Sequence, residues 1–215
     1  MVLGSPEMMD GVCYSYVNEV NCVIVSVQYR LTPEHPFPPG TEDCYAALQW
    51  FYENAEQLGV DATRIGIDGA SAGGGLTLAV SLMARDRQGP PLIFQMPLYP
   101  MIDHRNTTPS RYEITDKRVW GREHNLKAWN MYLGEEGDKD VSPYAAPAHA
   151  TDLSGLPPTF TFIGDLDLFR DETIELVAKL SQAGVPTEFT LYPATFMGLK
   201  VWHLRQMLVN TQRNL

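Results

Sequence analysis

The segment from Arg64 to Gly75 (RIGIDGASAGGG) constrains the fold most, because it joins an apolar run to a helical pattern through small residues. Arg64–Asp68 has the length and composition of a strand. Leu76–Met83 is apolar on nearly every side, as in a buried helix. The small residues between them allow a sharp turn with Ser71 at its tip. This pattern is typical of α/β architectures.

Four further apolar runs have the length and composition of strands. Helical patterns separate most of them. One begins after Thr41, its expected N-cap, and extends to Leu58; two others cover Asp171–Ala183 and Val201–Val209. The alternation predicts a single α/β domain over residues 1–215, with helices on a mainly parallel sheet. The four runs are Cys22–Gln28, Leu92–Met96, Thr159–Ile163 and Glu188–Tyr192.

Residues 103–150 interrupt the alternation, since they contain no clear strand and only one helical stretch, from His124 to Leu133. The segment follows the carboxyl end of a strand, where α/β folds bind ligands. We interpret it as a cap over a site. A packed subdomain with no role in ligand binding fits the sequence equally well.

The charge balance excludes several classes of partner. The net charge of −10 argues against nucleic acid and against anionic membranes, which both require a basic surface. No apolar run reaches the ~18 residues of a membrane span. The three cysteines have no metal-binding spacing, and no signal peptide precedes the first strand. We therefore expect a cytoplasmic protein without a metal or another cofactor.

Residues 69–73 (GASAG) match the G-x-S-x-G pattern of a nucleophilic serine at a strand-to-helix turn. In that interpretation the Ala72 N–H, at the start of the helix, faces a developing oxyanion. Two alternatives are a turn that only packs helix against strand and a phosphate-binding loop. The second fits poorly, because neither G-K-[ST] nor G-x-G-x-x-G is present.

Several motifs together resemble the hormone-sensitive-lipase-like branch of the α/β-hydrolases, which includes bacterial carboxylesterases. The resemblance covers essentially the whole chain. One difference is Ala70, where the family usually has aspartate. The motifs are YRLTPEHPFP at residues 29–38, SAGG at 71–74, LYPMID at 98–103 and DLFRDE at 167–172.

The resemblance implies a Ser…Asp…His triad that hydrolyses small carboxylic esters through an acyl-enzyme. Ser71 is then the nucleophile and Asp167 the acid that orients the histidine. Taken alone, Asp167 would be interpreted as an acid that caps the following helix, and Asp165 is a weaker candidate for the triad. Asp171 is expected in the first turn of that helix. Whether the chain forms a homodimer is left open by the sequence.

The chain departs from the family at the position of the histidine, which is Met197. A thioether cannot accept and return a proton at neutral pH. His203, six residues later, is a weak substitute. His35 is interpreted as structural. The remaining histidines, His104, His124 and His149, lie in or beside the cap region without motif support.

A second departure is at the start of the sequence. Residues 1–5 (MVLGS) resemble the phrase that follows the family's H-G-G-G segment, which supplies most of the oxyanion hole. The resemblance thus implies that the N-terminal strands are missing. One of them lies between the Cys22–Gln28 strand and the strand before Ser71. These two strands are expected either to close up or to leave unpaired backbone groups.

Two hypotheses of function follow. The first is an ester hydrolase that keeps Ser71 and Asp167 but is weak or inactive in this chain. The second is a non-catalytic protein that binds acyl ligands, or a degenerate relic.

Overall fold

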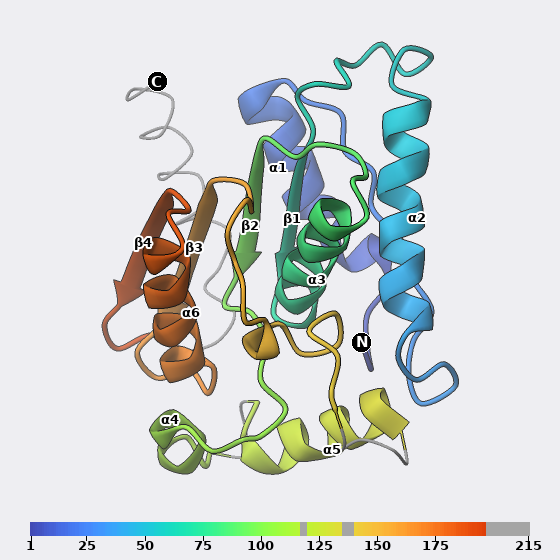
Figure 1. Ribbon diagram of the computed structural model, residues 1–215. Helices are drawn as coiled ribbons and strands as arrows, with labels where there is room; N and C mark the ends of the chain where they lie inside the picture. The colour runs from blue at the N-terminus through green and yellow to red at the C-terminus, as the bar shows by residue number, and fades with distance from the viewer. Residues whose placement is uncertain (117–119, 135–139, 197–215) are drawn as a thin grey trace.

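The computed structural model describes residues 1–116, 120–134 and 140–196. Its four parallel strands are arranged in the order β1-β2-β3-β4. This confirms the expected α/β fold with a parallel sheet (Figure 1). Within the described residues, no helix is long and apolar enough to cross a membrane. The strands are β1 (Gly66–Ala70), β2 (Phe94–Leu98), β3 (Thr159–Gly164) and β4 (Thr187–Tyr192).

The register of the strands brings their carboxyl ends to one edge of the sheet. β1 pairs with β2 from Gly66 opposite Phe94 to Ala70 opposite Leu98. β3 pairs with β4 along six residues. Beyond the end of β2, the Tyr99 N–H still donates to the Phe162 carbonyl at 3.0 Å. The loops that follow β1, β2 and β3 therefore emerge side by side.

Helices cover both faces of the sheet (Figure 1). α3 (Ala72–Asp86) and α6 (Arg170–Gln182) share one face and one apolar cluster. α2 (Pro39–Glu53) packs beside α3, while η1 (Pro6–Met9) leads into α1 (Asp10–Val20) behind β1. α3 is buried along most of its length, as the sequence predicts for an apolar helix.

Several predicted boundaries are wrong. β1 begins at Gly66 rather than Arg64 and extends to Ala70, because pairing with β2 continues up to the turn. Likewise, β2 begins two residues later than expected. The ends of β3, β4 and α6 differ from the prediction by one residue.

The prediction for α2 is wrong at both ends. The helix begins at Pro39, which suits the first position of a helix because its nitrogen carries no hydrogen. Thr41 therefore lies inside the first turn, and its hydroxyl is 2.8 Å from the Tyr132 hydroxyl. The helix ends at Glu53 rather than near Leu58. The Asn54 side chain donates to the Trp50 carbonyl at 2.8 Å, and a turn follows.

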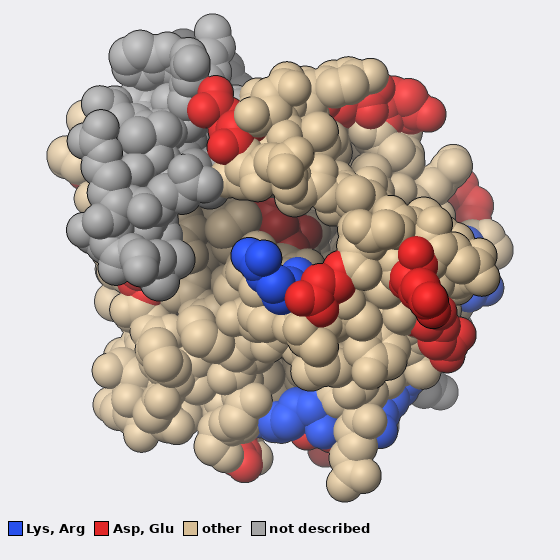
Figure 2. All heavy atoms as spheres, turned by 90° about the horizontal axis from the view of Figure 1, so that it is seen from above, with Lys and Arg blue, Asp and Glu red and all other residues tan. Residues whose placement is uncertain are grey.

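The predicted strand over Cys22–Gln28 is also wrong, since residues 21–30 form no strand. Within the described residues, no backbone group of this stretch pairs with β1, whose neighbour is β2. Val23 is 48% exposed, although its residue type favours burial in a sheet. The segment and β1 have thus not closed up. Viewed from the end at which the strands begin, the surface is hollowed near its centre, with acidic side chains at depth (Figure 2).

The segment 103–150 lies across the carboxyl edge of the sheet (Figure 1). Its described residues contain helices but no strand, as expected. α5 (Arg122–Leu133) begins two residues before the predicted His124. Trp129 and Tyr132 of α5 pack in one apolar cluster with Ile163 and Phe169. The other elements are α4 (Pro109–Glu113) and η3 (Pro147–His149). The helix predicted at Val201–Val209 lies outside the described residues.

Candidate active site

Ser71 occupies a strained turn between the last residue of β1 and the first residue of α3. Its φ of 55° and ψ of −115° lie in a region that non-glycine residues rarely adopt. Three backbone hydrogen bonds hold it there. Its N–H donates to the Leu98 carbonyl at 2.9 Å, and its carbonyl accepts from Met101 at 2.9 Å and Gly75 at 3.1 Å. The predicted sharp turn at Ser71 is therefore present.

The glycines around Ser71 allow this close packing. A Cβ atom on Gly69 would lie 2.4 Å from the Gly73 carbonyl oxygen. A Cβ atom on Gly74 would lie 2.9 Å from the Pro100 side chain, and one on Gly75 would lie 2.2 Å from the Met101 carbonyl oxygen. The start of α3 thus packs directly on the loop after β2, and a side chain at Gly74 or Gly75 would separate them, while a side chain at Gly69 would push the turn away from α3 itself.

Ala72 is the first residue of α3, which has 15 residues. The first N–H groups of a helix have no carbonyl partner one turn earlier, and the helix dipole gives this end a partial positive charge. An oxyanion that forms beside Ser71 therefore lies at the favourable end of α3. This is the position that the sequence predicts for the Ala72 N–H.

Asp167 is buried, with 1% of its surface exposed, in the loop between β3 and α6. One carboxylate oxygen accepts the Phe169 N–H at 2.9 Å. The other, Oδ2, is buried and has no hydrogen-bond partner among the described residues. Burial raises the pKa of Asp167 to about 7, and the charge of Arg111 partly opposes this shift. Because the helical residues begin at Arg170 and Phe169 is the N-cap, Asp167 does not cap α6.

The loop of Asp167 is joined to the loop after β4. The Leu166 N–H donates to the Thr195 carbonyl at 3.1 Å, and the Thr195 N–H donates to the Asp165 carboxylate at 3.2 Å. Asp165 therefore holds the neighbouring loop. Position 197 follows two residues after Thr195 in the sequence. Met197 and His203 themselves lie outside the described residues.

Tyr99 follows directly after β2, the strand between β1 and β3, and the sequence did not single it out as a site residue. Its backbone has a φ of 34°, and its ring centroid is 5.5 Å from that of Phe162. Burial is the main reason that the pKa of Tyr99 is raised, and the charges of Asp68 and Asp167 add to it. Its phenol is therefore protonated at neutral pH. Its position after a strand that ends at the ligand-binding edge is a signal that could have identified it.

A buried ion pair fixes the start of the 103–150 segment against α6. Arg111 of α4 and Glu172 of α6 bond through their side chains, which are 0% and 1% exposed. Glu172 also accepts the Ile102 N–H at 3.2 Å. Asp171 lies in the first turn of α6, as expected, and accepts the Ser110 N–H at 2.7 Å. These contacts join the start of the 103–150 segment to α6, and the Ser110 hydroxyl also donates to the carbonyl of Leu168 in the loop of Asp167 at 2.9 Å.

Comparison with known proteins agrees with this geometry. A family model described as the alpha/beta hydrolase fold matches residues 1–199. The chain belongs to the α/β-hydrolase family. The resemblance to the esterase branch of that family is thereby confirmed, because relatives in this α/β-hydrolase group are named as esterases.

Among these α/β-hydrolases, carboxylesterase NlhH of Mycobacterium tuberculosis is 36% identical over 198 residues, which are 91% of this chain and 62% of the relative. Esterase LipI of the same organism is 35% identical over 187 residues, 87% of this chain and 58% of the relative. The structure of a bacterial heroin esterase superposes with a TM-score of 0.94 at 40% identity. That match covers 99% of this chain and 71% of the other.

This α/β-hydrolase chain therefore spans about three fifths of the length of LipI and NlhH, 58% and 62%. The family model's match, over residues 1–199, includes the Ser71 turn and the Asp167 loop. What those whole proteins do is carried to this chain only as a proposal.

Proposed function

We propose that this chain carries the nucleophile and the acid of a serine carboxylic ester hydrolase. The strained Ser71 turn at the N-terminus of α3 is the observation that carries the proposal. The buried Asp167 on the same edge of the sheet supports it, because one of its oxygens is available for a hydrogen bond. The relatives named as esterases support the same reaction class.

In the proposed reaction, the Ser71 oxygen attacks the ester carbonyl and the Ala72 N–H stabilises the oxyanion. The carbon–oxygen bond to the alcohol then breaks, and the alcohol leaves with a proton. Water attacks the acyl-enzyme, which releases the carboxylic acid and restores the Ser71 hydroxyl. Both steps need a group that accepts and returns a proton.

In this chain the family's histidine position holds Met197, which cannot perform that transfer. Asp167 then has no imidazole to orient at this position. We therefore infer slow turnover, reduced on the order of 10⁴- to 10⁶-fold relative to an intact triad. For faster turnover, a residue other than Met197, such as His203, would have to supply the base.

Hydrolysis of a short-chain p-nitrophenyl ester tests this proposal. We expect a slow rate that Ser71→Ala abolishes and Met197→His raises at least tenfold. Met197→Gln is the matched control, since glutamine has a similar length but cannot act as a base. A rate that is unchanged by Ser71→Ala would contradict the assignment of the nucleophile. No gain from Met197→His over Met197→Gln would contradict the assignment of position 197.

A fluorophosphonate reagent gives a second readout that does not depend on turnover. We expect a covalent adduct on Ser71, detected by mass spectrometry and absent from Ser71→Ala. Reversible binding of acyl ligands without any adduct would instead support the alternative of a non-catalytic binding protein.

We also propose that residues 103–150 cover the acyl site, because they lie across the edge on which the Ser71 and Asp167 loops emerge (Figure 1). The cytoplasmic location and the homodimer stay predictions from the sequence.

A further inference from the structure

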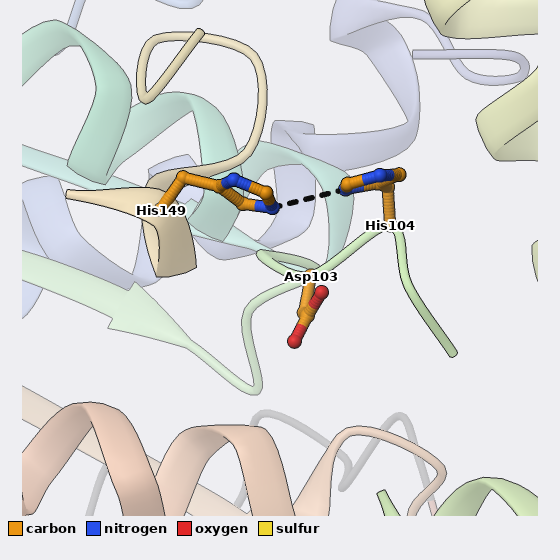
Figure 3. Close-up of side chains that lie close together, drawn as sticks. All are labelled: Asp103, His104 and His149. Atoms are coloured by element: carbon orange, nitrogen blue, oxygen red, sulfur yellow. Dashed lines mark hydrogen bonds between the residues drawn. The ribbon is translucent and has the colours of Figure 1, made fainter. Parts of the chain in front are cut away.

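Three side chains of metal-binding type lie close together at the base of the 103–150 segment (Figure 3). Asp103 and His104 follow β2, and His149 is the last residue of η3. One ligand atom from each of the three lies within 4.8 Å of the others. The two rings face each other, with His149 Nε2 3.1 Å from His104 Nδ1. None of the three belongs to the Ser71 turn or the Asp167 loop.

The distance between the two ring nitrogens suits two ligands of one ion. Zinc binds imidazole nitrogen at ~2.0–2.1 Å, so two such ligands in a tetrahedral site are ~3.3 Å apart. The observed 3.1 Å is close to this value. Carboxylate oxygen completes a ligand set that zinc accepts.

The surroundings hold the two rings in place but leave them accessible. The His104 ring packs against the buried Trp129 ring, with centroids 6.1 Å apart. The His149 N–H donates to the carbonyl of buried Ala146 at 2.9 Å, which fixes the end of η3. Both histidines are half-buried, so that an ion can reach them from solvent.

Asp103 can bind an ion only after its carboxylate is released from Arg105. Its carboxylate is turned away from the rings in Figure 3. It accepts from Arg105 Nε at 2.8 Å and from Arg105 Nη2 at 2.6 Å. The Arg105 side chain is 48% exposed, so it can return to solvent when a dication replaces it. Lys179 is a further cation beside His149, and its Nζ donates to the Ala148 carbonyl at 3.4 Å.

We propose that His104, His149 and Asp103 form a binding site for a divalent transition-metal ion of the zinc class. His104 and His149 are 45 residues apart, at the two ends of the 103–150 segment. An ion held by both joins the two ends of this long segment in the folded chain, and the unfolded chain does not hold the two rings together to bind it. Binding therefore stabilises the folded state by holding the two ends of the segment together.

Calorimetric titration of the whole chain with zinc chloride tests the site. We expect His104→Gln and His149→Gln to weaken binding at least about tenfold and to remove the zinc-dependent rise in unfolding temperature. His124→Gln is the matched control, because His124 is an exposed histidine of the same segment. The three cysteines are common to all variants, so the difference between variants reports the site.

Arg105→Gln tests the role of Asp103 without disturbing a buried residue. It removes the guanidinium that occupies both carboxylate oxygens, so we expect zinc to bind several-fold more tightly. The proposal is overturned if zinc binds His149→Gln as tightly as the unaltered chain, or if the unaltered chain binds no zinc at millimolar concentration. An unchanged affinity in Arg105→Gln would remove Asp103 from the ligand set.

Discussion

At the scale of single residues, the Ser71 turn depends on positions that have no side chain. Gly69 and Gly73 are both small residues of the G-x-S-x-G pattern, but their surroundings differ. A Cβ atom on Gly69 would lie 2.4 Å from the Gly73 carbonyl oxygen and 2.8 Å from the Thr77 hydroxyl. A Cβ atom on Gly73 would meet nothing within 4 Å. Alanine substitutions at these two positions can therefore be compared directly, one with a close contact and one without.

We expect Gly69→Ala to destabilise the fold by about 1–3 kcal/mol, because the added methyl group overlaps backbone that cannot move away easily. Gly73→Ala should leave stability unchanged or raise it by up to about 1 kcal/mol, since alanine favours a helix more than glycine does. Urea unfolding of the two variants measures both effects. Equal losses in the two would show that the turn is not packed as described.

The buried carboxyl of Asp167 is expected to make the free energy of unfolding depend on pH. Burial raises its pKa to about 7 in the folded chain, above the unperturbed value near 4. Between these two values the unfolded state ionises while the folded state keeps its proton. The contribution of Asp167 therefore becomes less favourable as the pH rises from about 4 to about 7, and it stays constant above that.

Asp167→Asn should remove this loss and keep the hydrogen bond from the Phe169 N–H. The variant should match the unaltered chain near pH 4 and exceed its free energy of unfolding by a few kcal/mol near pH 8. Asp152→Asn is a control of opposite sign, because hydrogen bonds from Ser154 lower the pKa of that exposed carboxyl. Parallel pH profiles for Asp167→Asn and the unaltered chain would show that the buried carboxyl is ionised at no cost.

The sequence identified the residues whose pattern is local. Ser71 and its small neighbours are contiguous, and Asp167 lies within a contiguous motif, so the turn and the loop that hold them could be predicted, while their catalytic roles stay proposals. Arg111 could not, because an isolated arginine in a polar stretch gives no sign that it is buried. The contact between His104 and His149 joins a loop to the short helix η3 far away in the sequence and leaves no periodic signal.

At the scale of elements, the pair of Arg111 and Glu172 joins α4 to α6 without access to water. Arg111→Met should cost about 3–5 kcal/mol of stability, because it leaves the Glu172 carboxylate buried without its partner. Replacing both residues with methionine should cost less than the single change, since no unpaired charge then remains. Thermal or urea unfolding measures all three chains.

The exposed pair of Arg30 and Asp43 provides the comparison. Their side chains are 51% and 26% exposed, so Arg30→Gln should change stability by no more than about 1 kcal/mol. If the double replacement of Arg111 and Glu172 proved as damaging as Arg111→Met alone, the loss would come from packing and not from an uncompensated charge.

The strands also show that an apolar run by itself is not sufficient to predict a strand. β3 and β4 were predicted to within one residue, because each pairs along its whole apolar run. Cys22–Gln28 is also an apolar run of strand length but forms no strand, since a strand also requires a neighbour to pair with its backbone hydrogen-bonding groups. The composition of a segment indicates that it is able to form a strand. It does not indicate whether a neighbouring strand is present to pair with it.

At the scale of the whole molecule, residues 103–150 were open to two interpretations, a cap and a packed subdomain. The described part of this segment contributes Trp129 and Tyr132 to the same cluster as Ile163 and Phe169 of the sheet and its loops. Trp129 is only 2% exposed. α5 is therefore part of the core, and its packing alone does not exclude that the segment also covers a ligand.

This arrangement predicts that the segment and the sheet unfold together. Trp129→Ala should lower the free energy of unfolding by about 3–5 kcal/mol, because it empties a buried position shared by both. Unfolding in urea should stay a single transition, coincident by circular dichroism and by tryptophan fluorescence. Tyr112→Ala is the control in the same segment, since Tyr112 is 59% exposed and should change stability by about 0.5 kcal/mol or less. Two separate transitions, or a loss in Trp129→Ala confined to the fluorescence signal, would instead show a lid that detaches while the sheet stays folded.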